Sequence, residues 1–153
     1  MTQYAHPEVL VDTSWVKGSL GDQNVRVVEV DYDPTANYNL GHIPGSVLVD
    51  WRKDINDPVA RDIVSKKGLE SLLGRLGISN KHRIVLYGDF NNWFAAFAFW
   101  VFKFYGVENV VLLDGWNNPG HADRCRGDSR AGLQFSASSR VFRSCWPAMR
   151  SGF

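Results

Sequence analysis

An apolar strand, a short polar loop and an apolar helix follow one another in the segment Arg83–Gly106, and this order constrains the fold more than any other feature. The segment is "RIVLYGDFNNWFAAFAFWVFKFYG". The run "RIVLYG" is typical of a buried strand. The helix after it is apolar on most sides, so we expect it to be largely buried. This order favours a parallel sheet, in which ligands bind outside the carboxyl ends of the strands.

Other segments repeat the alternation of strand and helix. Leucines at helical spacing (69, 72, 73 and 76) predict a helix that ends at Gly77. The segment "VDTSWVKGSL" predicts a short helix capped by Asp12, Thr13 or Ser14. Further strands are predicted at Val25–Asp31, Ser46–Trp51 and Asn109–Gly115. We therefore expect an α/β fold: a single domain with a mostly parallel sheet that is flanked by helices on both faces.

The overall charge and the residue types exclude several classes of function. The net charge of +1 over 153 residues predicts no attraction to nucleic acid. No apolar run reaches the length of a membrane helix, so no membrane partner is expected. Two cysteines and no visible secretory signal favour a reducing, cytoplasmic location. The four histidines do not have the spacing of metal ligands, and neither a metal nor a cofactor is expected.

The composition changes sharply near Gly115. Residues 1–115 hold 11 Lys and Arg against 14 Asp and Glu, whereas residues 116–153 hold 6 Arg, no Lys and 2 Asp. The second part contains both cysteines and shows no helical or strand periodicity. We predict a domain at residues 1–115, incomplete at its C-terminal end, and an irregular tail at residues 116–153. Our hypothesis is that the tail derives from a frameshift in a longer gene.

Two motifs in residues 8–115 resemble a known family. The segment "VDYDPTANYNLGHIPGSVLVDW" is similar to the part of rhodanese-type sulfurtransferases in which an acidic strand end precedes a Gly-His-Ile-Pro-Gly turn. The segment "VVLLDG" resembles a later rhodanese strand. The similarity is closest to the N-terminal, non-catalytic half of tandem-domain thiosulfate and 3-mercaptopyruvate sulfurtransferases. The motif residues implied to be structural are Asp31, Gly41, His42, Ile43, Pro44, Gly45, Asp114 and Gly115.

The resemblance implies a reaction and a substrate. In this family a Cys thiolate takes the sulfane sulfur of thiosulfate as a persulfide and passes it to cyanide or another thiophile. The nucleophile lies in the loop between a strand and a helix, a position that falls here on Gly88 or Asp89. The loop that would cradle thiosulfate or a similar small anion consists of Asp89, Phe90, Asn91, Asn92 and Trp93.

Because neither Gly88 nor Asp89 can form a persulfide, this chain is expected to be a truncated, catalytically silent member of a sulfurtransferase family. The alternative is a non-catalytic anion-binding or interaction module. The apolar helix would present one face to another domain, so we expect either a missing C-terminal rhodanese domain or self-association.

Several residues keep two interpretations. Cys125 and Arg130 have the spacing of an anion-binding catalytic loop, but no predicted strand precedes Cys125, as such a loop requires. The other cysteine is Cys145. Asp89 is either a nucleophile or metal ligand, or the cap of the helix that starts near Asn92. His42 is either a general base or a hydrogen-bonded structural residue. For the strand-end residues Asp31 and Asp114, bonds to loop amides are favoured over catalysis.

Overall fold

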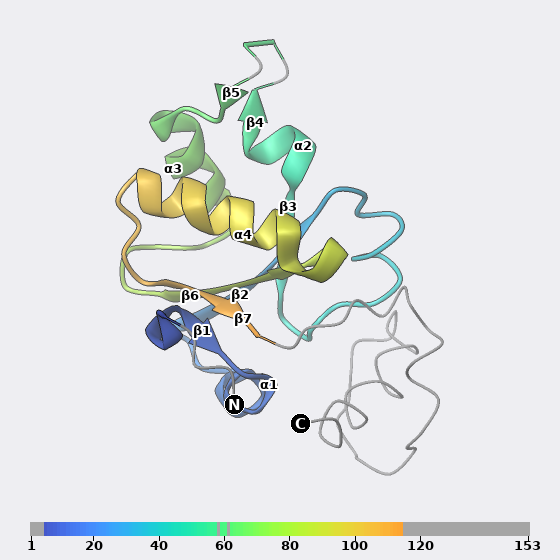
Figure 1. The fold of residues 1–153 in the computed structure, drawn as a ribbon, viewed down its shortest axis with the longest axis vertical. Helices are drawn as coiled ribbons and strands as arrows, with labels where there is room; N and C mark the ends of the chain where they lie inside the picture. Colours follow the sequence, from blue (N-terminus) through green and yellow to red (C-terminus); the bar gives the residue numbers. More distant parts are fainter. Residues whose placement is uncertain (1–4, 58, 61, 115–153) are drawn as a thin grey trace.

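A five-stranded parallel sheet forms the centre of the protein (Figure 1). The computed structural model describes residues 5–57, 59–60 and 62–114. The strands of the sheet are, in spatial order, β1 (Leu10–Val11), β7 (Val110–Leu113), β6 (Arg83–Gly88), β2 (Val25–Asp31) and β3 (Val47–Asp50). Each neighbouring pair is parallel. A separate antiparallel pair, β4 (Asn56–Asp57) and β5 (Asp62–Ile63), lies beyond the sheet.

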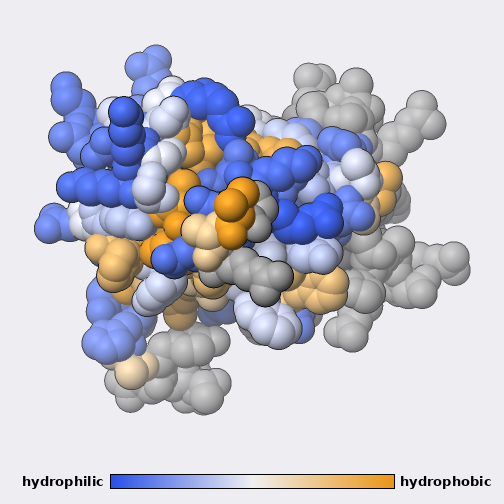
Figure 2. All heavy atoms as spheres, turned by 90° about the horizontal axis from the view of Figure 1, so that it is seen from above, coloured by the Kyte–Doolittle hydropathy of each residue, from blue (hydrophilic) through white to orange (hydrophobic). Residues whose placement is uncertain are grey.

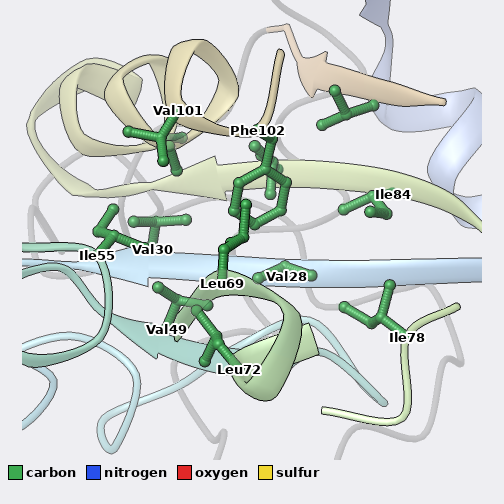
Figure 3. Packing of buried hydrophobic residues seen from close by; sticks show 14 residues of the cluster. Val28, Val30, Val49, Ile55, Leu69, Leu72, Ile78, Ile84, Val101 and Phe102 are labelled. Carbon is green, nitrogen blue, oxygen red and sulfur yellow. The ribbon is translucent and has the colours of Figure 1, made fainter. Parts of the chain in front are cut away.

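Helices cover both faces of the sheet, as predicted. They are η1 (Pro7–Val9), α1 (Thr13–Ser19), α2 (Trp51–Asp54), α3 (Lys66–Arg75) and α4 (Asp89–Phe104). Val27 of β2 packs with Val16 of α1, whereas Val28 belongs to the core beneath α3 and α4. Figure 3 shows this second core, in which Leu69 of α3 and Phe102 of α4 meet over the strands. Alternate residues of the central strands therefore bury apolar surface on opposite faces.

Local polar contacts set the ends of the helices. Asp12 caps α1, because its carboxylate accepts a hydrogen bond from the Trp15 N–H at 2.7 Å. Asp12 is one of the three residues that the sequence offered as the cap of this helix. Gly77, with φ +67°, ends α3, and the Ile78 N–H then donates to the Leu73 carbonyl at 2.8 Å. The predicted helix stop at Gly77 is confirmed.

Some elements differ from the prediction. The strand predicted at Ser46–Trp51 is shorter, because the Asp50 carboxylate accepts from the Arg52 and Lys53 N–H groups and starts α2 at Trp51. The last strand ends at Leu113 instead of Gly115. The sequence analysis missed β1, β4 and β5, since a two-residue strand shows no alternation that could be recognised.

Part of the predicted chain lies outside the described residues. Gly115, Cys125, Arg130 and Cys145 are among the residues that the structure does not describe, as is the whole predicted tail, 116–153. Within the described ranges, every helix is too short or too polar to cross a bilayer.

Candidate functional site

The carboxyl ends of β2 and β6 meet at one edge of the sheet and bring together residues far apart in the sequence. Val30 of β2 pairs with Gly88 of β6, so Asp31 and Asp89 follow neighbouring strand positions. Both aspartates are buried. Asp114, at the end of β7, is exposed, and its N–H donates to the Val11 carbonyl at 2.8 Å. Of the three strand-end acids considered, two therefore belong to one buried site.

The turn between β6 and α4 has a strained backbone. Phe90, Asn91 and Asn92 have φ values of 48°, 55° and 64°, which place all three in the left-handed region. This conformation costs a residue such as Phe90 about 1–2 kcal/mol relative to the right-handed one, and it costs Asn less. Regular helix begins only at Trp93. A turn of this kind persists only when surrounding contacts hold it.

Asn92 supplies two of these contacts. Its Oδ1 accepts from the Gly88 N–H at 3.0 Å, and its Nδ2 donates to the Leu113 carbonyl at 2.6 Å. The side chain therefore ties the turn to the end of β7. The same contact occupies the Gly88 N–H, so this amide is not available to an anion in the cradle.

Gly88 lies where no side chain fits. A Cβ at this position would fall well inside van der Waals contact of the Val30 carbonyl oxygen and 3.2 Å from its carbonyl carbon. Because that oxygen belongs to the backbone of a central strand, it cannot rotate away. On this backbone, Cys could not occupy position 88, and Asp89 is the first residue of the turn that has a side chain.

The Asp89 side chain points into the protein instead of capping α4. The residue is only 2% exposed, and its Oδ2 accepts from the Asn37 Nδ2 at 2.9 Å and from the Tyr32 N–H at 3.4 Å. Neither carboxylate oxygen of Asp89 accepts a hydrogen bond from the first turn of regular helix, which starts at Trp93. The predicted capping role of Asp89 is therefore wrong, because the left-handed turn aims the carboxylate at the β2–β3 loop (residues 32–46).

The Gly-His-Ile-Pro-Gly motif forms a turn within the β2–β3 loop. The Ser46 N–H donates to the Ile43 carbonyl at 2.9 Å, and Gly45 has φ +78°. The His42 ring stacks on Tyr38 with centroids 3.9 Å apart, and its Nδ1 donates to the Tyr38 carbonyl at 2.9 Å. These contacts favour the structural interpretation of His42 over a general base. Gly41 is buried in the same motif, and Pro44 precedes the glycine of the turn.

Tyr87 connects this motif to the centre of the sheet. Its hydroxyl accepts from the Ile43 N–H at 3.0 Å, lies 3.0 Å from the Ser46 Oγ and donates to Glu29 Oε2. Tyr87 is completely buried. Burial, together with the nearby Glu29 carboxyl, raises the pKa of Tyr87 well above its ordinary value.

Three carboxyl groups give the site an unusual electrostatic character. Glu29 is 1% exposed and Asp31 is fully buried. Burial, assisted by the charge of Asp31, raises the pKa of Glu29 to about 9. Burial and the charge of Asp89 raise the pKa of Asp31 to about 7. Burial also raises the pKa of Asp89. Glu29 is therefore protonated at neutral pH, and the negative charge that remains on Asp31 and Asp89 opposes the approach of a small anion.

Exposed aromatic side chains line the outer side of α4. Phe90, Trp93, Trp100 and Phe104 are 64%, 72%, 51% and 63% exposed. We call these four residues the α4 aromatic stripe. Phe102, on the opposite side of the same helix, is fully buried. In Figure 2, which shows one face of the molecule, apolar side chains interrupt the hydrophilic surface.

The remaining aromatic residues of α4 pack inward. Phe94 and Phe97 lie partly buried against the core. Phe94 contacts Tyr32 and Trp51, with ring centroids 5.5 and 5.0 Å apart. The expectation that this helix is largely buried therefore holds for Phe94, Phe97, Phe99 and Phe102, and fails for the four residues of the α4 aromatic stripe.

Sequence reasoning missed half of the site. Glu29 appeared only as part of a strand, and Asn37 and Tyr38 only as part of a loop. The signal that could have located Glu29 is its acid side chain between valines in a strand that is buried on both faces. Among the described residues, no group of three or more His, Cys, Asp or Glu is arranged to hold a metal ion.

Known proteins match most of the chain. The family profile "Rhodanese-like domain" matches residues 12–117. "Sulfur carrier protein TtuD" of Thermus thermophilus is 54% identical over 112 residues, which are 73% of this chain and 39% of that protein. "Thiosulfate sulfurtransferase" of Corynebacterium glutamicum is 44% identical over 113 residues, 74% of this chain and 37% of that protein.

A solved structure shares the fold. SseA from Escherichia coli, described with the rhodanese fold of 3-mercaptopyruvate sulfotransferases, superposes with a TM-score of 0.60 at 22% identity, over 69% of this chain and 44% of that one. The alignments with these relatives cover between 72% and 89% of this chain. An alignment that covers 89% of 153 residues must include residues beyond 115. The chain spans 37–51% of the length of these relatives.

Proposed function

This chain belongs to the rhodanese-like domain family, and we propose that its described domain is a member without a sulfur-transfer nucleophile, which acts as the non-catalytic partner of a sulfurtransferase domain. The relatives named above include a thiosulfate sulfurtransferase and a sulfur carrier protein. The observation that carries the proposal is the start of the β6–α4 turn: Gly88 has no room for a side chain, and Asp89 buries its carboxylate against the β2–β3 loop.

Sulfur transfer needs a thiolate that is stabilised by amides or positive charge. The turn after β6 offers a carboxylate, with Glu29 and Asp31 buried behind it. The Gly88 N–H, which could help to hold an anion, already donates to Asn92. These features oppose both persulfide formation and the binding of thiosulfate at this turn.

The test is formation of thiocyanate from thiosulfate and cyanide by the purified full chain. We expect no thiocyanate above the uncatalysed background, with the Corynebacterium glutamicum relative as the positive control. Measurable turnover by the wild-type chain would contradict the proposal. Turnover lost in Cys125→Ser would assign catalysis to that thiol, whereas turnover surviving both Cys125→Ser and Cys145→Ser would require chemistry without a thiol.

The anion-binding alternative has a separate readout. A ligand that binds only the folded state raises the unfolding temperature. An anion-binding module would show such a shift with thiosulfate or sulfate. Because the turn carries buried carboxyl groups, we expect no shift at concentrations of about ten millimolar beyond that produced by chloride at equal ionic strength.

The α4 aromatic stripe favours a second candidate function, that of an interaction module. Exposed Trp and Phe side chains on one helix form the kind of apolar surface that marks a protein interface. The partner we propose is a second rhodanese-like domain; in its absence, a second copy of this chain would cover the stripe. Light scattering after gel filtration would reveal the self-association, and a strictly monomeric chain at high concentration would contradict it.

A further inference from the structure

Glu29, Asp31 and Asp89 bring three carboxyl groups to the same buried edge of the sheet. Two come from β2, and the third follows β6. Their residues are 1%, 0% and 2% exposed. Such groups are seldom fully buried unless a partner neutralises them. Within the described residues, no Lys, Arg or His forms an ion pair with any of the three.

Two of these carboxyl groups hold the β2–β3 loop. Asp31 Oδ2 accepts from the Tyr38 N–H at 3.0 Å. Asp89 Oδ2 accepts from the Asn37 Nδ2 at 2.9 Å and from the Tyr32 N–H at 3.4 Å. The loop is therefore anchored on the sheet at its start and near its middle, by acceptors from two different elements.

The other oxygen of each aspartate, Oδ1, is buried and has no hydrogen bond of good geometry among the described residues. For Asp31, burial and the charge of Asp89 raise the pKa and outweigh the nearby Glu29 carboxyl and Asp89 N–H, which lower it. A buried charged oxygen without a donor costs more than about 1–3 kcal/mol. A proton on one carboxyl group removes one charge and supplies a donor. A proton bound to either group therefore lowers the cost of burying this pair of carboxyl groups.

The surrounding groups do not remove the need for that proton. Asp33 in the loop adds negative charge near Asp89. Asp50 of β3, paired in register with Asp31, has its own partner in Lys53 at 3.0 Å. The other titratable or charged groups around the cluster are Tyr38 and His42 of the loop, Tyr87 of β6 and Arg52 of α2, whose guanidinium lies over the Tyr32 ring at 4.6 Å.

We propose that Glu29, Asp31 and Asp89 form a proton-dependent latch, which holds the β2–β3 loop on the sheet while Asp31 keeps a proton and releases the first half of that loop when Asp31 and Asp89 are both ionised. The raised pKa of Asp31 places this transition near neutral pH.

The strands β2 and β6 pair with neighbours on both sides. The far end of the loop is also held to the sheet, where the Tyr87 hydroxyl contacts Ile43 and Ser46. The carboxylate contacts, in contrast, hold its first half, around Tyr32, Asn37 and Tyr38. Repulsion between the two carboxylates therefore displaces the first half of the loop.

Amide hydrogen exchange of the purified full chain tests the latch. The protection of residues 32–42 is measured from about pH 6 to about pH 8.5 and corrected for the intrinsic rise of exchange, with α3 (Lys66–Arg75) as the internal reference. We expect loop protection to fall by up to about tenfold per pH unit above the transition. Protection of α3 falls only by as much as the global stability of the domain, which urea unfolding gives at the same pH values.

Substitutions identify the group responsible. Asp31→Asn keeps the shape and removes the charge, so protection of the loop becomes independent of pH. Asp89→Asn should likewise make the protection of the loop independent of pH. This second variant tests the latch if Asp31→Asn does not fold. Glu70→Gln, on the exposed face of α3, keeps the wild-type response. The latch is refuted if wild-type protection does not change with pH, if neither Asn variant flattens it, or if His42→Gln alone abolishes the change.

Discussion

The side-chain amide of Asn92 bridges Gly88 and Leu113: Oδ1 accepts from the Gly88 N–H at 3.0 Å, and Nδ2 donates to the Leu113 carbonyl at 2.6 Å. One residue thus closes the β6–α4 turn and joins it to the neighbouring strand β7. Since Asn adopts the left-handed conformation more readily than most residues, it satisfies both the hydrogen bonds and the backbone at this position.

Asn92→Ala should destabilise the domain by about 2–3 kcal/mol, because two partly buried groups lose their partner and alanine is less tolerant of positive φ. Asn91→Gly is the matched control, since Asn91 is exposed with φ 55° and glycine relieves the strain there. We expect Asn91→Gly to be neutral or slightly stabilising. Urea unfolding measures both, and equal stabilities of the two variants would contradict the role given to Asn92.

Gly88→Ala should cost about 3 kcal/mol or more, because the new methyl group meets the backbone of β2 and not a movable side chain. Gly74→Ala, inside α3, is the comparison: nothing lies within 4 Å of its Cβ, and alanine favours the helix by about 0.5–1 kcal/mol. The two substitutions add the same methyl group with opposite expected signs. A Gly88→Ala variant as stable as the wild type would show that the strands can separate at this point.

The stability of the domain should fall as pH rises from about 5 to about 8. Asp31 has a pKa raised from 3.8 to about 7, so in this window the folded state holds a proton that the unfolded state has lost. Its contribution is complete below pH 4 and disappears as pH passes through 7; its size is about 2–4 kcal/mol. Glu29, with a pKa of about 9, extends the decline upward. Urea midpoints at several pH values measure the slope, and stability that increases over this window would exclude the assignment.

Trp100→Ser with Phe104→Ser should reduce self-association and leave the fold intact. Both residues belong to the α4 aromatic stripe and are more than half exposed. Phe102→Ser, on the buried side of the same helix, should instead destabilise the domain by about 3–5 kcal/mol. Gel filtration gives the size, and urea unfolding gives the stability. If the double variant associates as strongly as the wild type, another surface is responsible.

The sequence predicted the architecture because its strands and helices carry strong local signals. Val25–Asp31 and Arg83–Gly88 are dense in apolar residues, and the leucines of α3 recur at helical spacing. The site was harder to predict, because its contacts join residues far apart in the chain. Asp89 meets Asn37, 52 positions away, and Tyr87 meets Glu29, 58 positions away. The left-handed turn also has only a weak local signal, since Asn91 and Asn92 tolerate it but Phe90 does not suggest it.

The close approach of β2 to Gly88 also bears on how such a domain can evolve. A glycine codon that ends in a pyrimidine is one base change away from a cysteine codon, so a thiol at such a position can be reached by a single mutation. The Val30 carbonyl penalises that change before any new chemistry can be selected. A lineage that carries this backbone would have to move a central strand before a thiol could be accommodated at position 88.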